Sequence, residues 1–166
     1  AVGGLLASVF HLASPKNAIY AFSQWETSWL SREGILAIVT LLVFAPMAIA
    51  QIFLASDAWN WLGPIGTALA LLTVFSTSMI YTQLKAIPRW NMPINPVLFL
   101  LYAIAGGALL SMQAKVAGVL ILVLIALQWA GWMMGDGRLP GTRSSKGTAT
   151  GLDRIGTVTM FESAHT

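Results

Sequence analysis

The sequence has 166 residues, of which 57% are hydrophobic and only 9% are charged, with a formal net charge of +3 and no cysteine. A soluble domain has roughly 25% charged residues, so this composition excludes a water-facing surface and indicates a protein surrounded by lipid. The absence of cysteine excludes disulfides, a thiolate nucleophile, iron–sulfur clusters and Cys-ligated zinc within this chain.

The apolar runs are continuous rather than alternating, which favours spanning helices over barrel strands. Backbone in lipid must satisfy its own hydrogen bonds, and a helix does so within one segment. We therefore predict an all-α, polytopic transmembrane bundle: part of a first helix plus four spanning helices, with a short interfacial helix and a polar C-terminal segment. The bundle should occupy residues 1–134, and a polar extramembrane connector or tail should occupy residues 135–166.

The first predicted helix is incomplete. Ala1 stands inside its apolar run with no basic segment before it, so we expect the chain to begin partway through a helix and not with a signal peptide. Ser14 before Pro15 is a helix-start signal, an N-cap acceptor followed by proline at the first helical position. A short helix at the membrane surface should follow, with Trp25 and Trp29 at the depth of the lipid headgroups.

Four longer apolar segments come next, and about 20 residues are enough to cross the hydrocarbon core. Ser31 is expected to cap the first of them, and Pro46 is expected to kink it. The last two should form a tight hairpin that turns at residues 113–115. The predicted spans are residues 34–55, 63–84, 97–112 and 116–134.

Basic residues divide unequally between the two ends of the predicted bundle. If successive links alternate sides, all nine except Lys115 fall on one side. The positive-inside rule places that side in the cytoplasm. His11 and Glu33, at the two membrane ends of the first link, should then face the cytoplasm as well.

The same two residues are the best candidates for chemistry. His11 stands where a spanning helix emerges and can exchange a proton near neutral pH, and Glu33 stands where the next helix enters the membrane. A quinone head group needs polar partners for its oxygens, a proton route to water and an apolar slot for its tail, which this pair and its aromatic neighbours could supply. The alternative is that His11 caps its own helix and that Glu33 pairs with Arg32 or favours a helix N-terminus.

Other sites have less support in the sequence. A b-type haem in a bundle usually needs two axial histidines on facing helices, and the second histidine, His165, falls in the polar tail, so we expect no haem. No motif predicts a metal site. Lys85 and Arg89 are most simply positive-inside anchors, with the alternative that they meet an acidic partner surface.

The segment HLASPKNAIYAF, followed by SWLSREGI, resembles the membrane-anchor subunits of dimethyl-sulfoxide-reductase-type molybdoenzymes. The family pattern is a histidine, a leucine, a small residue, a variable residue and proline, and later Ser-x-Glu at the next helix. The segments STSMIYTQLKAIPRW and GLDRIGTVTMFESAHT are similar to further parts of the family. The resemblance covers most of the chain, and longer members carry additional helices.

The resemblance implies a haem-free anchor in the bacterial inner membrane. It would hold an iron–sulfur subunit and a molybdopterin catalytic subunit, and exchange electrons with membrane quinone, either menaquinone or ubiquinone. The family's quinol-site histidine and glutamate fall on His11 and Glu33, and we expect Ser14, Trp29 and Arg32 to join them. Reductases of this type place the quinone site on the periplasmic side, so the cytoplasmic side predicted here better resembles the sulfite-oxidising relatives.

Three hypotheses follow. In the first, the chain is a quinone-reactive anchor without a catalytic centre, docked to its partner through Lys16, Lys85 and Arg89, while sulfite oxidation or reduction of S- or N-oxides occurs in the partner. In the second, it is a purely structural anchor or assembly subunit. In the third, it is a small transporter, which would call for buried charges or broken helices at mid-membrane; apart from Pro46, the spans offer neither.

Overall fold

The computed structural model describes residues 20, 22–85, 87–138, 147 and 151–156. Within these residues the fold is all-helical, without a strand, as predicted. The predicted first helix and three of the predicted site residues, His11, Ser14 and Lys16, lie outside the described residues. The elements are α2 (Trp29–Phe53), α3 (Leu62–Thr82), α4 (Ile94–Leu110), α5 (Ala114–Arg138) and the short 3-10 helix η3 (Leu152–Arg154).

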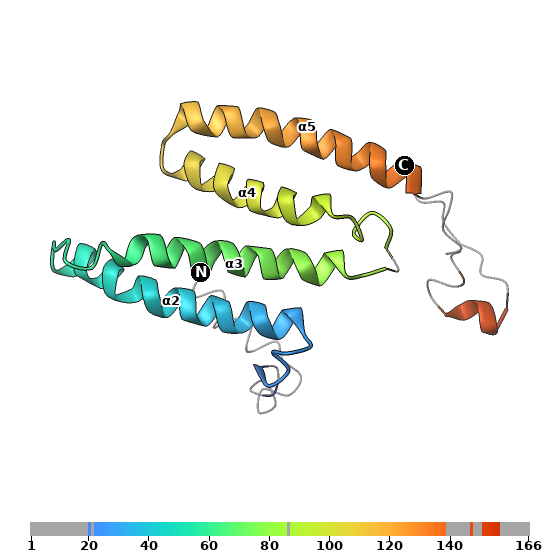
Figure 1. The fold of residues 1–166 in the computed structure, drawn as a ribbon, viewed down its shortest axis with the longest axis horizontal. Coiled ribbons are helices and arrows are strands. Elements are labelled where there is room, and N and C mark those ends of the chain that lie inside the picture. The colour runs from blue at the N-terminus through green and yellow to red at the C-terminus, as the bar shows by residue number, and fades with distance from the viewer. Residues whose placement is uncertain (1–19, 21, 86, 139–146, 148–150, 157–166) are drawn as a thin grey trace.

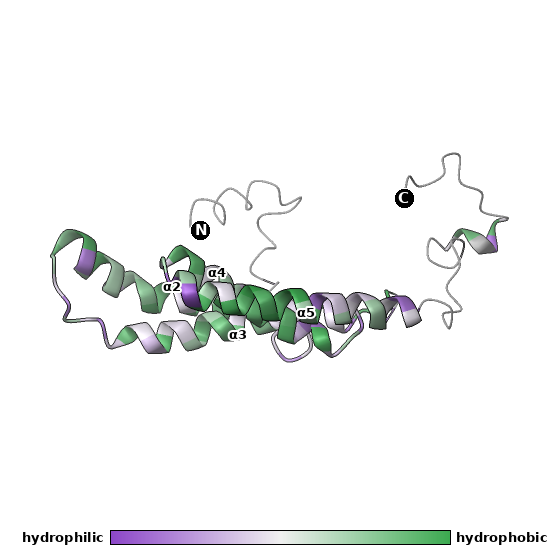
Figure 2. Ribbon diagram, turned by 90° about the horizontal axis from the view of Figure 1, so that it is seen from above, coloured by the Kyte–Doolittle hydropathy of each residue, from purple (hydrophilic) through white to green (hydrophobic). Residues whose placement is uncertain are grey.

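The four α-helices run antiparallel to their neighbours and lie side by side in chain order (Figure 1). α2 packs on α3, α3 on α4, and α4 on α5. In the perpendicular view the helices overlap over the middle of the bundle, while α2 and α3 diverge toward the link that joins them, so the four helices form one largely flat layer rather than a closed ring (Figure 2). This order brings the start of α2, the link 83–93 and the end of α5 to the same end of the bundle, as the alternation of the links predicted.

Three of the described helices, α2, α3 and α5, are long and apolar enough to cross a membrane. α4 is apolar too but has only 17 residues, about the length of the predicted span 97–112, and it is shorter than the other three helices. Large hydrophobic side chains such as Leu42, Ile52 and Leu122 are mostly exposed on the bundle. Hydrophobic residues make up most of the length of the helices in Figure 2, and the exposure of many of them fits a bundle whose outer surface faces lipid.

The N-cap of α2 is Ser28 rather than Ser31, so the predicted cap was wrong. Ser28 has an extended backbone, and its Oγ accepts a hydrogen bond of 3.4 Å from the N–H of Ser31. Both serines precede the same apolar run, and the earlier one starts the helix. α2 therefore begins more than one turn before the predicted residue 34, and the first two turns contain Trp29, Arg32 and Glu33.

The interface between α2 and α3 combines close packing with hydroxyl groups. A Cβ on Gly66 would lie 2.7 Å from ring atoms of Phe44, so the helices approach closely at this glycine. Further along, the hydroxyl oxygens of Thr40 and Thr73 are 3.3 Å apart. Each hydroxyl also donates to a carbonyl of its own helix, which keeps it hydrogen-bonded within an apolar bundle.

α4 and α5 pack around a small apolar core of Leu98, Ala105 and Leu124. The turn between these helices lies at 111–113, where Met112 has a φ of 60°, and not at the predicted 113–115. A left-handed residue ends a helix, and α5 then begins at Ala114. α5 continues to Arg138, one turn beyond the predicted end of the last span.

Candidate functional site

Glu33 lies in the second turn of α2 and is partly buried against α3. The hydroxyl of Thr77 on α3 donates a hydrogen bond of 2.7 Å to its Oε1. The two residues meet because α3 runs antiparallel to α2, so the last turns of α3 lie beside the first turns of α2 (Figure 1). The same hydroxyl is 3.0 Å from the carbonyl oxygen of Thr73, one turn earlier on α3.

Arg32 does not form an ion pair with Glu33, although the two are adjacent. Its Nε donates to the carbonyl of Trp25 at 2.8 Å, and its Nη2 donates to the carbonyl of Glu26 at 2.5 Å. The guanidinium carbon also lies 4.4 Å from the ring centre of Trp29, which is cation–π geometry. Arg32 thus fixes the turn that precedes α2 and leaves the carboxyl group of Glu33 to the Thr77 hydroxyl.

Trp29 connects this end of α2 to α3. Its ring meets that of Phe75 edge-on, with the ring centres 6.0 Å apart. Three of the predicted site residues, Trp29, Arg32 and Glu33, therefore come together at one end of the bundle, next to Phe75 and Thr77. Aromatic rings beside a carboxyl group at a membrane end give a surface that is apolar on one side and polar on the other.

Ser31 is the residue of this region that sequence reasoning misassigned. The residue is only 2% exposed, and its Oγ has no hydrogen-bond partner among the described residues. A buried hydroxyl without a partner costs free energy, so such groups are rare unless they serve another contact. Ser31 lies two residues before Glu33 and points to another side of α2, and a buried hydroxyl without a partner leaves no signal in a sequence.

Lys85 and Arg89, the two described residues of the predicted docking set, lie at the same end of the bundle as Glu33. Lys85 is exposed on the link 83–93 and makes no ion pair among the described residues. Arg89, on the same link, forms an ion pair with Asp136 near the end of α5. A Cβ on Gly135 would lie 3.0 Å from the Cγ of Arg89, so the arginine stem passes closely over α5. The positive charge of Arg89 is thus partly compensated within the chain.

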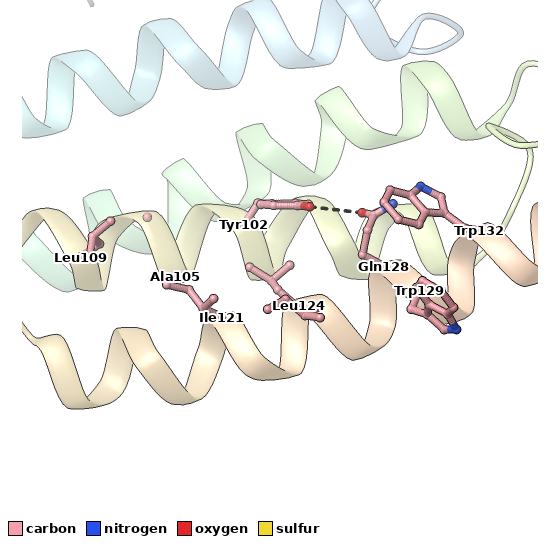
Figure 3. A pocket seen from close by; sticks show the side chains of 10 residues that line it. Tyr102, Ala105, Leu109, Ile121, Leu124, Gln128, Trp129 and Trp132 are labelled. Carbon is pink, nitrogen blue, oxygen red and sulfur yellow. Dashed lines mark hydrogen bonds between the residues drawn. The ribbon is translucent and has the colours of Figure 1, made fainter. Parts of the chain in front are cut away.

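A groove of about 390 Å³ lies elsewhere, between α4 and α5. In Figure 3, Tyr102 on α4 points toward Gln128 on α5, and its hydroxyl donates to the Gln128 Oε1 at 3.2 Å. Trp129 and Trp132 lie near Gln128 along α5 (Figure 3). No sequence pattern singles out this groove, and the predicted site residues that the structure describes do not line it. The Glu33 region contains a carboxyl group, whereas the groove is lined almost entirely by apolar side chains.

Comparison with known proteins identifies the family. The family model described as DMSO reductase anchor subunit (DmsC) matches residues 2–129. The chain belongs to this family of membrane anchor subunits. The resemblance seen in the HLASPK and SREG segments is thereby confirmed.

A curated relative of this anchor subunit is a sulfite dehydrogenase subunit from Allochromatium vinosum. It is 37% identical over 122 residues, which covers 66% of this chain and 38% of the relative. The chain thus spans well under half the length of that relative. The similarity to a sulfite dehydrogenase subunit agrees with the predicted likeness to the sulfite-oxidising members. No solved structure matches the chain.

Proposed function

We propose that this anchor subunit exchanges electrons with membrane quinone at the Glu33 end of the bundle. The electrons pass between the quinone and an iron–sulfur subunit bound to the anchor, which is connected in turn to a molybdopterin catalytic subunit. Membership in the DmsC family and similarity to a sulfite dehydrogenase subunit support the assignment to such a complex. By the same likeness, the reaction at the catalytic subunit is sulfite oxidation.

The observation that carries the proposal is the environment of Glu33. Its described polar partner is the neutral hydroxyl of Thr77, while the neighbouring Arg32 donates to backbone carbonyls instead. A carboxylate held by a guanidinium would be fixed in its charged form, because the ion pair would be lost on protonation. A hydroxyl can pair with either form of a carboxyl group, because it donates a hydrogen bond to the carboxylate and accepts one from the acid.

The described residues fit a quinone head group in two respects. Glu33 offers a proton, and the rings of Trp29 and Phe75 offer apolar contact. When bound, quinone supplies two-electron, two-proton redox chemistry. His11, which lies outside the described residues, is proposed as a second polar partner, together with Ser14.

Charge supports a cytoplasmic location for this end in a bacterial inner membrane. The end with Glu33 carries Lys85, Arg89 and Arg138 in addition to Arg32, whereas the opposite end of the described bundle carries Lys115. The positive-inside rule assigns the more basic end to the cytoplasm. An iron–sulfur subunit docked there, through Lys16, Lys85 and Arg89, would be close to the quinone.

The proposal is tested with the complete protein assembled with its partner subunits. We expect Glu33→Gln and His11→Ala to lower quinone-coupled turnover by about a hundredfold or more, the range typical of a lost proton donor or acceptor. Turnover with a soluble dye that takes electrons from the partner subunits should stay at the wild-type level. Glu26→Gln, at an exposed residue just before α2, is the matched control. Full quinone-coupled activity in both site variants would refute the quinone site and support the hypothesis of a purely structural anchor.

A further inference from the structure

We propose that Thr77 is a positioning residue that allows Glu33 to gain and lose its proton without any movement of the two helices. The inference rests on the proposed function, because it assigns the partner through which the Glu33 carboxyl group works. It concerns α3, a helix in which the sequence indicated no site residue.

The geometry provides two hydrogen-bond acceptors for one hydroxyl. The Thr77 Oγ1 is 2.7 Å from the Glu33 Oε1 and 3.0 Å from the carbonyl oxygen of Thr73. A hydroxyl has a single proton to donate and lone pairs with which to accept. It therefore bonds one of these acceptors as a donor at any moment, and both positions are already within bonding distance.

The two protonation states of Glu33 use these positions differently. When Glu33 is ionised, Thr77 donates its proton to the carboxylate. When Glu33 is protonated, the carboxylic acid donates to the Thr77 Oγ1, and the Thr77 proton turns toward the carbonyl of Thr73. The Thr77 proton never leaves its oxygen. The proton that does move is that of Glu33, which passes to the quinone oxygen and is replaced from water at this end of the bundle.

A comparison within the same interface separates this role from ordinary helix packing. Thr40 and Thr73 also place hydroxyl groups between α2 and α3, but each donates to its own helix, and they contact each other at 3.3 Å. Among the described residues, no titratable group is bonded to that pair. Thr77 differs because its shorter hydrogen bond reaches a carboxyl group on the facing helix.

Other charged or titratable groups near Glu33 are engaged elsewhere in the described structure. On its own helix, Arg32 donates to the carbonyls of Trp25 and Glu26. On α3, the ring of Tyr81 packs against Trp90 and Phe99. Within the part of the chain that the structure describes, Thr77 is therefore the residue whose hydroxyl can change its hydrogen bonding when Glu33 gains or loses its proton.

The test uses Thr77→Val, which keeps the branched shape but removes the hydroxyl, and Thr77→Ser, which keeps the hydroxyl. Both are made in the assembled complex, with Thr40→Val as a matched control for losing a hydroxyl at the α2–α3 interface. Quinone-coupled turnover is measured together with the infrared carboxyl band of Glu33 in redox difference spectra, identified by its loss in Glu33→Gln. We expect Thr77→Val to lower turnover by about tenfold or more and to shift the band. Thr77→Ser and Thr40→Val should keep both close to wild type.

The outcomes separate this inference from the proposed function. If Glu33→Gln lowers turnover while Thr77→Val keeps the wild-type rate and band, the role of Thr77 is refuted and the quinone site stands. If Glu33→Gln itself is fully active, the proposed function fails. Should Thr77→Val not assemble, Thr77→Ala removes the same hydroxyl with less bulk. Failure of both to assemble, with Thr77→Ser normal, would show that the hydroxyl serves packing and would overturn the inference.

Discussion

Arg89 and Asp136 form an ion pair that ties the link 83–93 to the end of α5. The side chains are 52% and 58% exposed, and Arg138 adds a second tie through a hydrogen bond of 2.7 Å to the carbonyl of Asn91. A pair this exposed contributes little to stability, about 1 kcal/mol at most. Its main effect is on charge, since Asp136 compensates one of the basic groups at the proposed docking end.

The first prediction concerns the partial neutralisation of the Arg89 charge by Asp136. We expect Asp136→Asn to leave the melting temperature of the anchor nearly unchanged and to strengthen binding of the iron–sulfur subunit at low salt. Lys85→Gln should weaken the same binding, with the difference fading as ionic strength rises. Binding of the partner to the anchor in detergent, measured across a salt series, checks both. An effect of equal size at high salt would argue against docking by charge.

The second prediction tests the cap of α2. Ser28→Ala should lower the free energy of unfolding by about 1 kcal/mol, because the N–H of Ser31 loses its acceptor. Ser31→Ala should be neutral or stabilising, since it removes a buried hydroxyl that has no partner among the described residues. Thermal unfolding in detergent checks both variants, and the reverse order of stability would restore Ser31 as the cap.

The third prediction addresses the approach of α2 to α3. Gly66→Ala would place a methyl group 2.7 Å from the ring of Phe44, and we expect a loss of about 1–3 kcal/mol from overpacking. Gly106→Ala is the matched control, because no described atom outside its own helix turn lies within 4 Å of the added carbon. Combining Gly66→Ala with Phe44→Leu should recover part of the loss. Equal melting temperatures for the two glycine variants would contradict the packing described.

The fourth prediction separates the role of the two hydrogen bonds donated by the Arg32 guanidinium from the role of its positive charge. Arg32 donates from two nitrogens to the carbonyls of Trp25 and Glu26 while stacking on Trp29. Lysine keeps the charge but lacks the planar fork, so Arg32→Lys should raise the KM for quinone nearly as much as Arg32→Gln. Steady-state quinone kinetics on the assembled complex check this. Recovery of the wild-type KM by lysine would show that charge alone is needed.

The fifth prediction distinguishes the Glu33 region from the groove between α4 and α5. Tyr102→Phe removes the hydrogen bond to Gln128 and should cost about 0.6 kcal/mol, a typical value inside a membrane. Quinone-coupled turnover should stay at the wild-type level. A large loss of turnover with an unchanged melting temperature would move the quinone site to the groove.

The number and placement of the described helices could be predicted because apolar runs of sufficient length leave a lipid-embedded chain little choice. The boundaries were harder, as Ser28 and Ser31 show. Both are good caps before the same run, and the choice between them depends on the extended backbone at Ser28. The turn at Met112 was likewise set by a left-handed residue that the side-chain pattern does not reveal.

The candidate site was predictable only on one helix. Trp29, Arg32 and Glu33 are close in the chain, and the resemblance to the family marks this segment. Thr77 lies 44 residues from Glu33 in the chain, and their contact depends on the offset between α2 and α3 along the helix axes. That offset is set by close contacts such as Gly66 against Phe44, which no single-sequence pattern specifies.

The flat arrangement of the helices has a consequence for modularity. The main contacts join only neighbours in the chain, α2 with α3, α3 with α4 and α4 with α5. The hydrogen-bonded pair of Glu33 and Thr77 lies within the first of these interfaces. We therefore expect substitutions on the outward side of α5, which has no main contact with α2 or α3, to adapt the anchor to different surroundings while leaving this pair in place.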